Sequence, residues 1–181
     1  MERYYSQTVG TEIFTETGLR VGRVLDVVTD PNTGKIQGFL LAPRGREAIS
    51  PLDVLYWSNR IIVHDSEDIL DADEIVKIRK VLELDIPIIR NKVETENGEY
   101  LGHVFDYTID NKLFIMTKIL VAKSFLWLFP HDERIIAHKN IVEIKKDVII
   151  VKNSGGTVRV REKKPQKMKE KLSIDPAPTP S

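Results

Sequence analysis

Two aspartates, Asp26 and Asp106, lie in apolar segments 80 residues apart, and carboxylates are the residue type that a general acid–base pair requires. A catalytic pair needs both carboxylates at one site, and nothing in the sequence brings these two together. The alternative is that each side chain accepts backbone hydrogen bonds near a turn, or points outward. The sequence favours this structural role, because buried polar groups are normally satisfied by backbone partners.

The four histidines, His64, His103, His131 and His138, form no H-E-x-x-H or H-x-H motif. The chain has no cysteine, so a zinc site would need three ligands drawn from these histidines and from carboxylates. GxSxG, P-loop and GxGxxG motifs are also absent from the sequence. We therefore predict no catalytic residue, no metal site, no cofactor and no enzyme activity.

Composition indicates a globular protein. The 181 residues are 41% hydrophobic and 30% charged. Lys+Arg and Asp+Glu both number 27, which removes the basic excess typical of nucleic-acid-binding domains. The first ten residues, MERYYSQTVG, lack the apolar core of a signal peptide, and no segment reaches the about 20 apolar residues of a membrane span. Together with the lack of cysteine, this predicts a cytoplasmic location.

An internal repeat organises most of the chain. Residues 15–30, TETGLRVGRVLDVVTD, align without a gap with residues 95–110, TENGEYLGHVFDYTID, and seven of the 16 positions are identical. Chance gives about one. Residues 48–65 also resemble residues 135–152, now at an offset of 87 instead of 80. Seven extra residues therefore fall before this second match, near the stretch SFLWLFPHDER.

Each copy is predicted to be a small β module. Residues 21–29 are rich in β-branched side chains. A hairpin turn follows at 30–35, where Pro31 presets φ and Gly34 supplies a left-handed residue, and Ile36–Leu41 returns as the partner strand. Short strands with frequent turn signals predict a barrel or a sandwich.

A helix is predicted between the copies, and a tail after them. Asp71 is the expected N-cap, with Glu74 in capping-box spacing, and Ile75, Ile78 and Leu82 fall on one face. The helix should end before Pro87. Beyond a short strand at 157–161, the tail is polar, rich in lysine and proline, and expected to be disordered.

The first copy contains a T-E-x-G turn, a second Gly four residues on, a Val-x-Asp motif and an Asp at the hairpin. A P-L-x-x-V segment then precedes an I-I-V strand. In this pattern the first copy resembles the PRC-barrel family. The second copy keeps part of this pattern but has His138 in place of the proline. The resemblance implies a six-stranded β-barrel per copy and a protein-binding role, as in the photosynthetic reaction-centre H subunit and a ribosome-maturation factor. The structural motif residues are Gly18, Gly22, Asp26, Asp30, Gly34, Pro51, Gly98, Gly102, Asp106 and Asp110.

An aromatic run lies where the two copies lose their alignment. It either packs inside its own chain, forms an interaction surface, or touches a membrane interface. In the first copy, Tyr56 and Trp57 lie just before the last strand. They either form one binding face together with the aromatic run or occupy core positions. The residues of the run are Phe125, Leu126, Trp127, Leu128 and Phe129.

The sequence as a whole predicts a mainly β protein: two small six-stranded PRC-type barrels in tandem, with a helical linker and a disordered tail. The expected boundaries are 1–67, 68–86, 87–156 and 157–181. We expect a non-enzymatic adaptor or scaffold that binds a protein partner through the aromatic run, Tyr56 and Trp57. A homo-oligomer is one of the assemblies that the sequence leaves open. Alternatives are a ribosome- or RNA-associated factor, for which the tail offers seven Lys/Arg against three Asp/Glu, and a membrane-surface or cell-envelope organiser.

Overall fold

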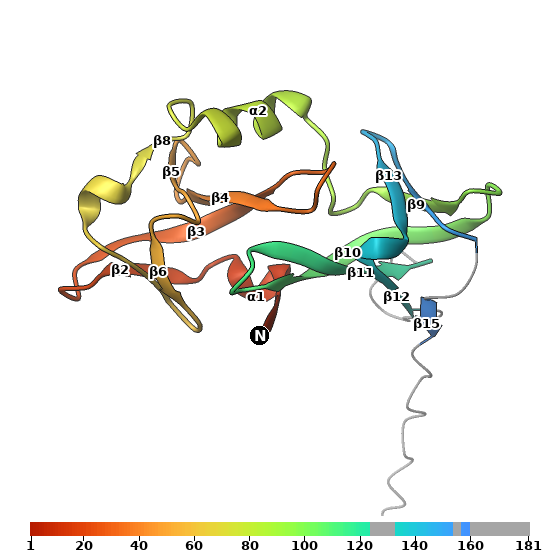
Figure 1. Ribbon diagram of the computed structural model, residues 1–181, viewed down its shortest axis with the longest axis horizontal. Helices are drawn as coiled ribbons and strands as arrows, with labels where there is room; N and C mark the ends of the chain where they lie inside the picture. Colours follow the sequence, from red (N-terminus) through yellow and green to blue (C-terminus); the bar gives the residue numbers. More distant parts are fainter. Residues whose placement is uncertain (124–132, 154–156, 160–181) are drawn as a thin grey trace, which may run out of the picture.

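The computed structural model describes residues 1–123, 133–153 and 157–159. It is mainly β, with two α-helices and two sheets that lie side by side (Figure 1). The aromatic run at 125–129, His131 and residues 160–181 lie outside the described residues.

The first sheet has the strand order β6-β7-β2-β3-β4-β5-β8. Its longest strand, β3, pairs with β2 over its first half and with β4 over its second half. Strand β2, the first of this sheet in the sequence, pairs in parallel with β7, which comes about 45 residues later in the chain. The strands are β2 Glu12–Thr15, β3 Arg20–Thr29, β4 Ile36–Leu41, β5 Glu47–Ile49, β6 Val54–Trp57, β7 Ile61–Val63 and β8 Leu70–Asp71.

The second sheet repeats this order as β13-β14-β9-β10-β11-β12-β15. The parallel pair recurs as β9 with β14, and the long strand recurs as β10. We call two residues counterparts when they occupy the same pairing position in the two sheets. The strands are β9 Lys92–Thr95, β10 Tyr100–Asp110, β11 Ile115–Ala122, β12 Glu133–Ala137, β13 Ile141–Ile144, β14 Val148–Val151 and β15 Thr157–Arg159.

Strand register locates the extra residues of the second half. Phe39 pairs with Ile49, and its counterpart Ile119 pairs with Ile136, so the offset rises from 80 to 87 between β11 and β12. The last strands differ from the sequence alignment. Ile13 pairs with Ile61, and Val93 with Ile149, an offset of 88. Four residues therefore lie between the paired residues Ile144 and Ile149, against three between Trp57 and Ile61.

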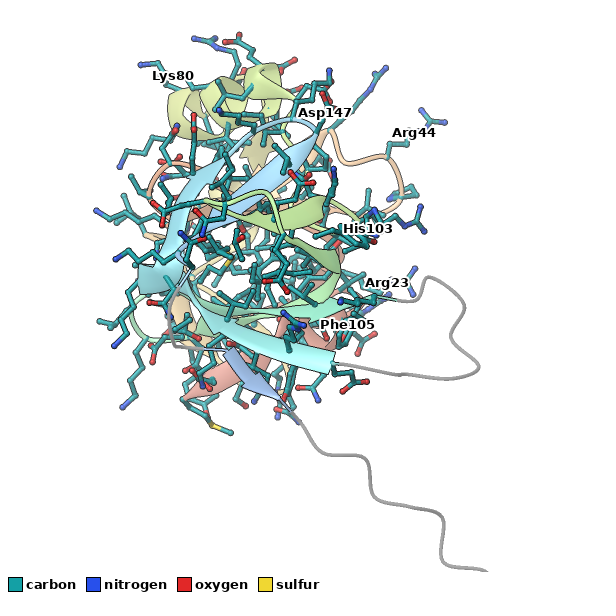
Figure 2. The ribbon with its side chains drawn as sticks, turned by 90° about the vertical axis from the view of Figure 1, so that its right-hand side faces the viewer. Arg23, Arg44, Lys80, His103, Phe105 and Asp147 are labelled. Atoms are coloured by element: carbon teal, nitrogen blue, oxygen red, sulfur yellow. The ribbon has the colours of Figure 1, made fainter. Side chains whose placement is uncertain are left out.

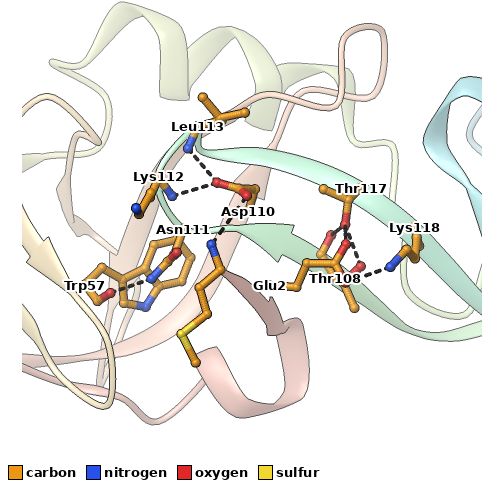
Figure 3. Close-up of polar contacts among 10 residues, drawn as sticks. Glu2, Trp57, Thr108, Asp110, Asn111, Lys112, Leu113, Thr117 and Lys118 are labelled. Atoms are coloured by element: carbon orange, nitrogen blue, oxygen red, sulfur yellow. Dashed lines mark hydrogen bonds and ion pairs between the residues drawn. The ribbon is translucent and has the colours of Figure 1, made fainter.

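The N-terminal segment crosses from the first half of the chain to the second sheet. β1 (Glu2–Tyr4) pairs antiparallel with the end of β10. Figure 3 shows the N-terminal amine 3.5 Å from Asp110, and the Glu2 carboxylate accepting hydrogen bonds from Thr117 and Lys118 at 2.8 and 2.7 Å. The short helix α1 (Tyr5–Thr8) follows at once and lies between the two sheets (Figure 1).

The two equivalent hairpin turns bind one another. Ile36 N donates to Phe114 O, and Met116 N donates to Gly34 O, both at 2.8 Å. Since Met116 is the counterpart of Ile36 and Phe114 of Gly34, the two bonds are reciprocal. Gly34 and Phe114 both have positive φ, at 71° and 50°. The second turn thus keeps the backbone form of the first although it lacks the glycine.

One hydrophobic cluster runs through both sheets, from Ile13 in β2 to Val151 in β14. At the junction, the Trp57 ring packs edge-on against Phe39 and stacks on Phe114, with centroids 5.0 and 5.6 Å apart. Asn111 Nδ2 donates to Trp57 O at 2.6 Å (Figure 3). The two halves therefore share apolar burial, the main favourable term in folding.

Helix α2 (Val76–Leu84) begins later than the sequence predicts. Asp71 belongs to β8, where it pairs with Glu47, and its side chain accepts from Asp73 N instead of capping the helix. Ile78 is buried as expected, but Leu82 is exposed. The helix covers the β3 and β4 side of the first sheet, and Lys80 points outward from it (Figures 1 and 2).

The close packing of α2 explains a glycine in β4. A Cβ added at Gly38 would lie 2.2 Å from Ile78 Cδ1, so only glycine lets the helix approach the strand this closely. Val28, Ala48 and Ala72 complete this small second cluster with Ile78. Helix α2 thus packs as part of the first half of the molecule, not as a free linker.

The expected segment boundaries also shift. β8 pairs with β5, so the first sheet extends into the segment predicted as linker. β15 pairs with β12, so Thr157–Arg159 belongs to the second sheet and not to the tail. The pairing of β8 with β5 is not visible in local patterns, because the two strands lie in separate segments. The strand at 157–159 falls within the short strand expected at 157–161, although the expected boundary placed it with the tail.

Candidate functional site

The two aspartates singled out in the sequence both contact helix α1. Asp106 accepts hydrogen bonds from Ser6 N at 3.1 Å, Ser6 Oγ at 2.6 Å and Tyr107 N at 2.9 Å. Asp26 accepts from Tyr5 Oη at 2.9 Å and from Val27 N at 2.7 Å. Each carboxylate therefore accepts a bond from the next residue of its own strand and fixes α1 between the sheets.

Two tyrosines stand beside these carboxylates. Tyr5 and Tyr107 stack with ring centroids 4.9 Å apart, and the Tyr107 hydroxyl lies 3.1 Å from Thr29 Oγ1. Burial, and next the charge of Asp26, raise the pKa of Tyr5. Burial also raises the pKa of Tyr107. Both phenols stay protonated at neutral pH, so the two tyrosines can donate hydrogen bonds, while the two carboxylates accept them.

The predicted turn glycines lie at two matching turns. Gly18 N donates to Thr15 O, and Gly98 N donates to Thr95 O, both at 2.9 Å. Gly22 and Gly102 lie where strands approach closely: an added Cβ would meet Leu41 Cδ2 at 2.8 Å or Ala122 O at 2.2 Å.

The hairpin aspartates have the same local role. Asp30 Oδ1 accepts from Asn32 N, and Asp110 Oδ1 accepts from the counterpart Lys112 N, both at 2.9 Å. Bonds from Leu113 N and Lys112 N lower the pKa of Asp110. Pro51 begins the turn before β6. The contacts of these residues stabilise turns, and among the described residues none belongs to a cluster that could hold a metal ion.

The histidines are dispersed over the described part of the chain. His64 Nδ1 lies 2.8 Å from Glu16 on the surface, and His103 Nδ1 lies 2.9 Å from the Tyr100 hydroxyl. His138 packs beside Gly34, and burial lowers its pKa. No group of three His, Asp or Glu side chains among the described residues is arranged to hold a metal ion. None of the described helices is long and apolar enough to cross a membrane.

Tyr56 and Trp57 have opposite environments. Trp57 is 4% exposed and occupies a core position, one of the two possibilities that the sequence left open. Tyr56 is 60% exposed. It lies on β6, which ends the first sheet and pairs only with β7 among the described strands. Leu52, in the turn before β6, and Leu55 are also exposed, and sequence reasoning did not single them out.

The same edge in the second sheet has a different character. Strand β13 pairs with β14 and ends its sheet, as β6 does. The counterparts of Leu52, Leu55 and Tyr56 are Lys139, Val142 and Glu143, and Glu143 forms an ion pair with Lys145 at 3.0 Å. Charged side chains discourage pairing of a sheet edge with another chain, whereas apolar ones invite it. The contrast is already visible in the sequence, where the repeat alignment at an offset of 87 places Tyr56 opposite Glu143.

The β-bulges add one exposed apolar residue to each long strand. The register of β3 shifts between Val24 and Asp26, and that of β10 between Val104 and Asp106. Leu25 and Phe105 occupy these bulges and are exposed. Figure 2 labels Phe105 and His103, both of which belong to β10.

Comparison with known families agrees with the strand pattern of the first half. Residues 1–87 match the family model of the PRC-barrel domain. The matched region contains the first sheet, α1 and α2. No curated protein matches the chain.

Proposed function

We propose that this protein is a non-enzymatic, protein-binding adaptor built from two tandem PRC-type barrels. The matching strand order of the two sheets supports the tandem arrangement. The apolar edge strand β6 carries the functional proposal. Leu52 is 85% exposed and Tyr56 60% exposed, beside a strand edge that no described strand covers.

Strand addition is the mode of binding that suits this edge. A partner strand beside β6 would gain main-chain hydrogen bonds, and its alternate side chains would contact Leu55 or Tyr56. Aromatic residues such as Tyr56 are enriched among the residues that contribute most to binding. The charged counterpart edge on β13 leaves one of the two sheets for this task, so the two halves would have divided roles.

The test transfers the β13 residues to β6. In affinity purification from the native organism, wild type is compared with a variant carrying Leu52→Lys, Leu55→Val and Tyr56→Glu. We expect partners of the wild type to be depleted by about tenfold or more, the effect of losing at least 1.4 kcal/mol of binding energy. Val142→Ser on β13 is the matched control and should retain them. Equal recovery by a folded triple variant would refute the role of β6.

The aromatic run at 125–129 is the second proposed contact, as expected from the sequence. A Phe125→Ser, Trp127→Ser, Phe129→Ser variant measured in the same purification separates its contribution from that of β6. Loss of partners in this variant alone would assign binding to the run.

A further inference from the structure

The outer face of the first sheet carries a row of apolar side chains that crosses three strands. Phe14 on β2 pairs with Ile62 on β7, and Ile62 pairs with Tyr56 on β6. Successive side chains of a strand point to opposite faces of a sheet. Ile13 and Ile61, the chain neighbours of this row, are fully buried, so the row faces outward. We call Phe14, Ile62 and Tyr56 the outer row; Tyr56 is exposed and the other two are half-buried.

The same row in the second half is charged. The corresponding pairs place Glu94 beside Ile150, and Ile150 beside Glu143. Each glutamate forms an ion pair within the chain, Glu94 with Lys92 and Glu143 with Lys145. The second half therefore presents paired charges where the first half presents two aromatic rings.

A cation stands beside the outer row. The Arg60 guanidinium lies 5.9 Å from the centroid of the Phe14 ring, within the range of a cation–π contact. Arg60 forms no ion pair with the residues that the structure describes, and the nearby Glu12 is already bound to Arg20 at 2.8 Å. The counterpart of Arg60 is Val148, so the second half lacks this charge. The first half thus combines an apolar row with one uncompensated positive charge.

A hollow of about 520 Å³ opens at the same place, lined by Phe14 and Arg60 among others. It lies between the segment that follows α1 and the turn that joins β6 to β7. Its volume falls within the range of about 300–1,000 Å³ that is usual for binding sites. The charged residues that line it are Glu12 and Arg60.

The second half closes the corresponding hollow with an asparagine. Asn91 Nδ2 donates to Pro87 O at 2.9 Å and to Lys145 O, in the turn between β13 and β14, at 2.7 Å. Thr11, the counterpart of Asn91, donates only to Gln7 O, at 3.2 Å. The shorter side chain does not reach the turn between β6 and β7, so the hollow of the first half stays open.

Charge and composition indicate the occupant of this face. The outer row gains most from an apolar or aromatic side chain, because burial of apolar surface is the main favourable term in association. The guanidinium of Arg60 presents a planar fork of donors that matches a carboxylate. An occupant with both groups side by side is therefore complementary to the site in shape of charge as well as in polarity.

We propose that the outer row and the hollow beside it bind an acidic peptide segment of a partner protein, in which an aromatic residue is adjacent to a carboxylate. The aromatic side chain packs on the outer row, and the carboxylate enters the hollow and accepts hydrogen bonds from Arg60. This inference rests on the proposed adaptor function, but it does not depend on strand addition to β6.

The probe is the peptide acetyl-Leu-Phe-Glu-amide with a fluorine at the para position of its ring, titrated with the full chain and followed by fluorine NMR. We expect saturable binding with a Kd of about 1 mM or below. The same peptide with Gln in place of Glu lacks the negative charge. It should bind about tenfold more weakly, the loss expected for a charge-assisted hydrogen bond.

Variants of the chain locate the binding site. Arg60→Gln should weaken binding of the Glu peptide about tenfold, and Arg60→Lys less, because lysine keeps the charge but loses the planar fork. Thr11→Asn introduces the residue that closes the second half, and it should reduce binding with Arg60 still in place. Arg44→Gln, at an exposed position in the turn between β4 and β5, is the matched control and should leave binding unchanged.

The proposal is overturned if no saturation is reached by about 10 mM peptide, or if the Glu and Gln peptides, or wild type and Arg60→Gln, bind equally. Amide NMR shifts at Phe14 and Ile62 on dilution of the chain alone would assign the face to a second copy instead. In the affinity purification, Arg60→Gln may be compared directly with the β6 triple variant. Partners lost from the triple variant but retained by Arg60→Gln would refute this inference and leave the adaptor function standing.

Discussion

Phe114 shows how a single residue combines backbone strain with packing. Its φ of 50° is the region that glycine adopts freely, and its counterpart is Gly34. Its ring stacks on Trp57. We expect Phe114→Ala to be less stable than Phe114→Gly by about 1 kcal/mol, because alanine loses the ring but keeps the left-handed backbone cost. Urea unfolding measures the order, and an alanine variant at least as stable as the glycine variant would contradict it.

His138 gives the junction a pH dependence. An added Cβ at Gly34 would lie 2.5 Å from His138 Nε2. The imidazole of His138, in the second half, therefore packs directly on the hairpin turn of the first half. Burial lowers the pKa of His138 below its ordinary value of 6.5, so the unfolded state binds more protons between these two values. This contribution to stability is present above pH 6.5 and is lost as the pH falls through the folded-state pKa.

The expected result is that His138→Gln loses less stability than wild type on acidification from about pH 7 to pH 5, a range that spans the ordinary histidine pKa. Urea midpoints at several pH values measure this. Asn140→Gln, in the same short helix but without a titratable side chain, is the control and should follow the wild-type profile. Parallel curves for wild type and His138→Gln would exclude this histidine as the source.

At the scale of elements, β15 protects an edge of the second sheet. It pairs with Arg134 to Ile136 of β12. Deleting residues 154–181 removes β15, and we expect amides of β12 to exchange about tenfold faster or more, since edge amides open at lower free energy. Hydrogen-exchange mass spectrometry measures the change. Deleting residues 160–181 keeps β15 and is the matched control; faster exchange in both variants would assign the protection to the tail instead.

Elements with local signals were predictable, and those held by distant partners were not. The β-branched run became β3, and Asp30 and Gly34 formed the expected hairpin. The N-cap at Asp71 was wrong because pairing with Glu47 draws that residue into β8. Strand β1 was missed because its partner lies about 100 residues away, and its own residues carry no strong strand pattern.

The candidate site follows the same division. The sequence nominated Tyr56, together with Trp57, for partner binding, and it predicted that the two aspartates either accept backbone hydrogen bonds or point outward. It could not reveal that Ser6 and Tyr5 bind these aspartates, because those contacts depend on how the halves pack. The contrast between Tyr56 and Glu143 was present in the alignment, but only sheet order shows that both lie on edge strands.

At the scale of the whole molecule, several kinds of contact join the two halves. The hairpins exchange main-chain hydrogen bonds, β1 pairs with β10, and Trp57 stacks on Phe114. The apolar cluster is continuous across both sheets. Small domains bury a low fraction of their surface and are marginally stable, so a shared core stabilises two small sheets more than separate cores would.

This arrangement predicts one cooperative unfolding transition for the full chain. Calorimetry should give a ratio of calorimetric to van't Hoff enthalpy near one, as for a two-state domain. The fragment of residues 1–87, although it spans the region matched by the family model, lacks β10 and Phe114 and leaves β1 without its partner. We therefore expect this fragment to unfold at lower urea than the full chain, or to self-associate and so cover Phe39 and Trp57. Two resolved transitions, with a monomeric fragment as stable as the whole, would show that the halves fold independently.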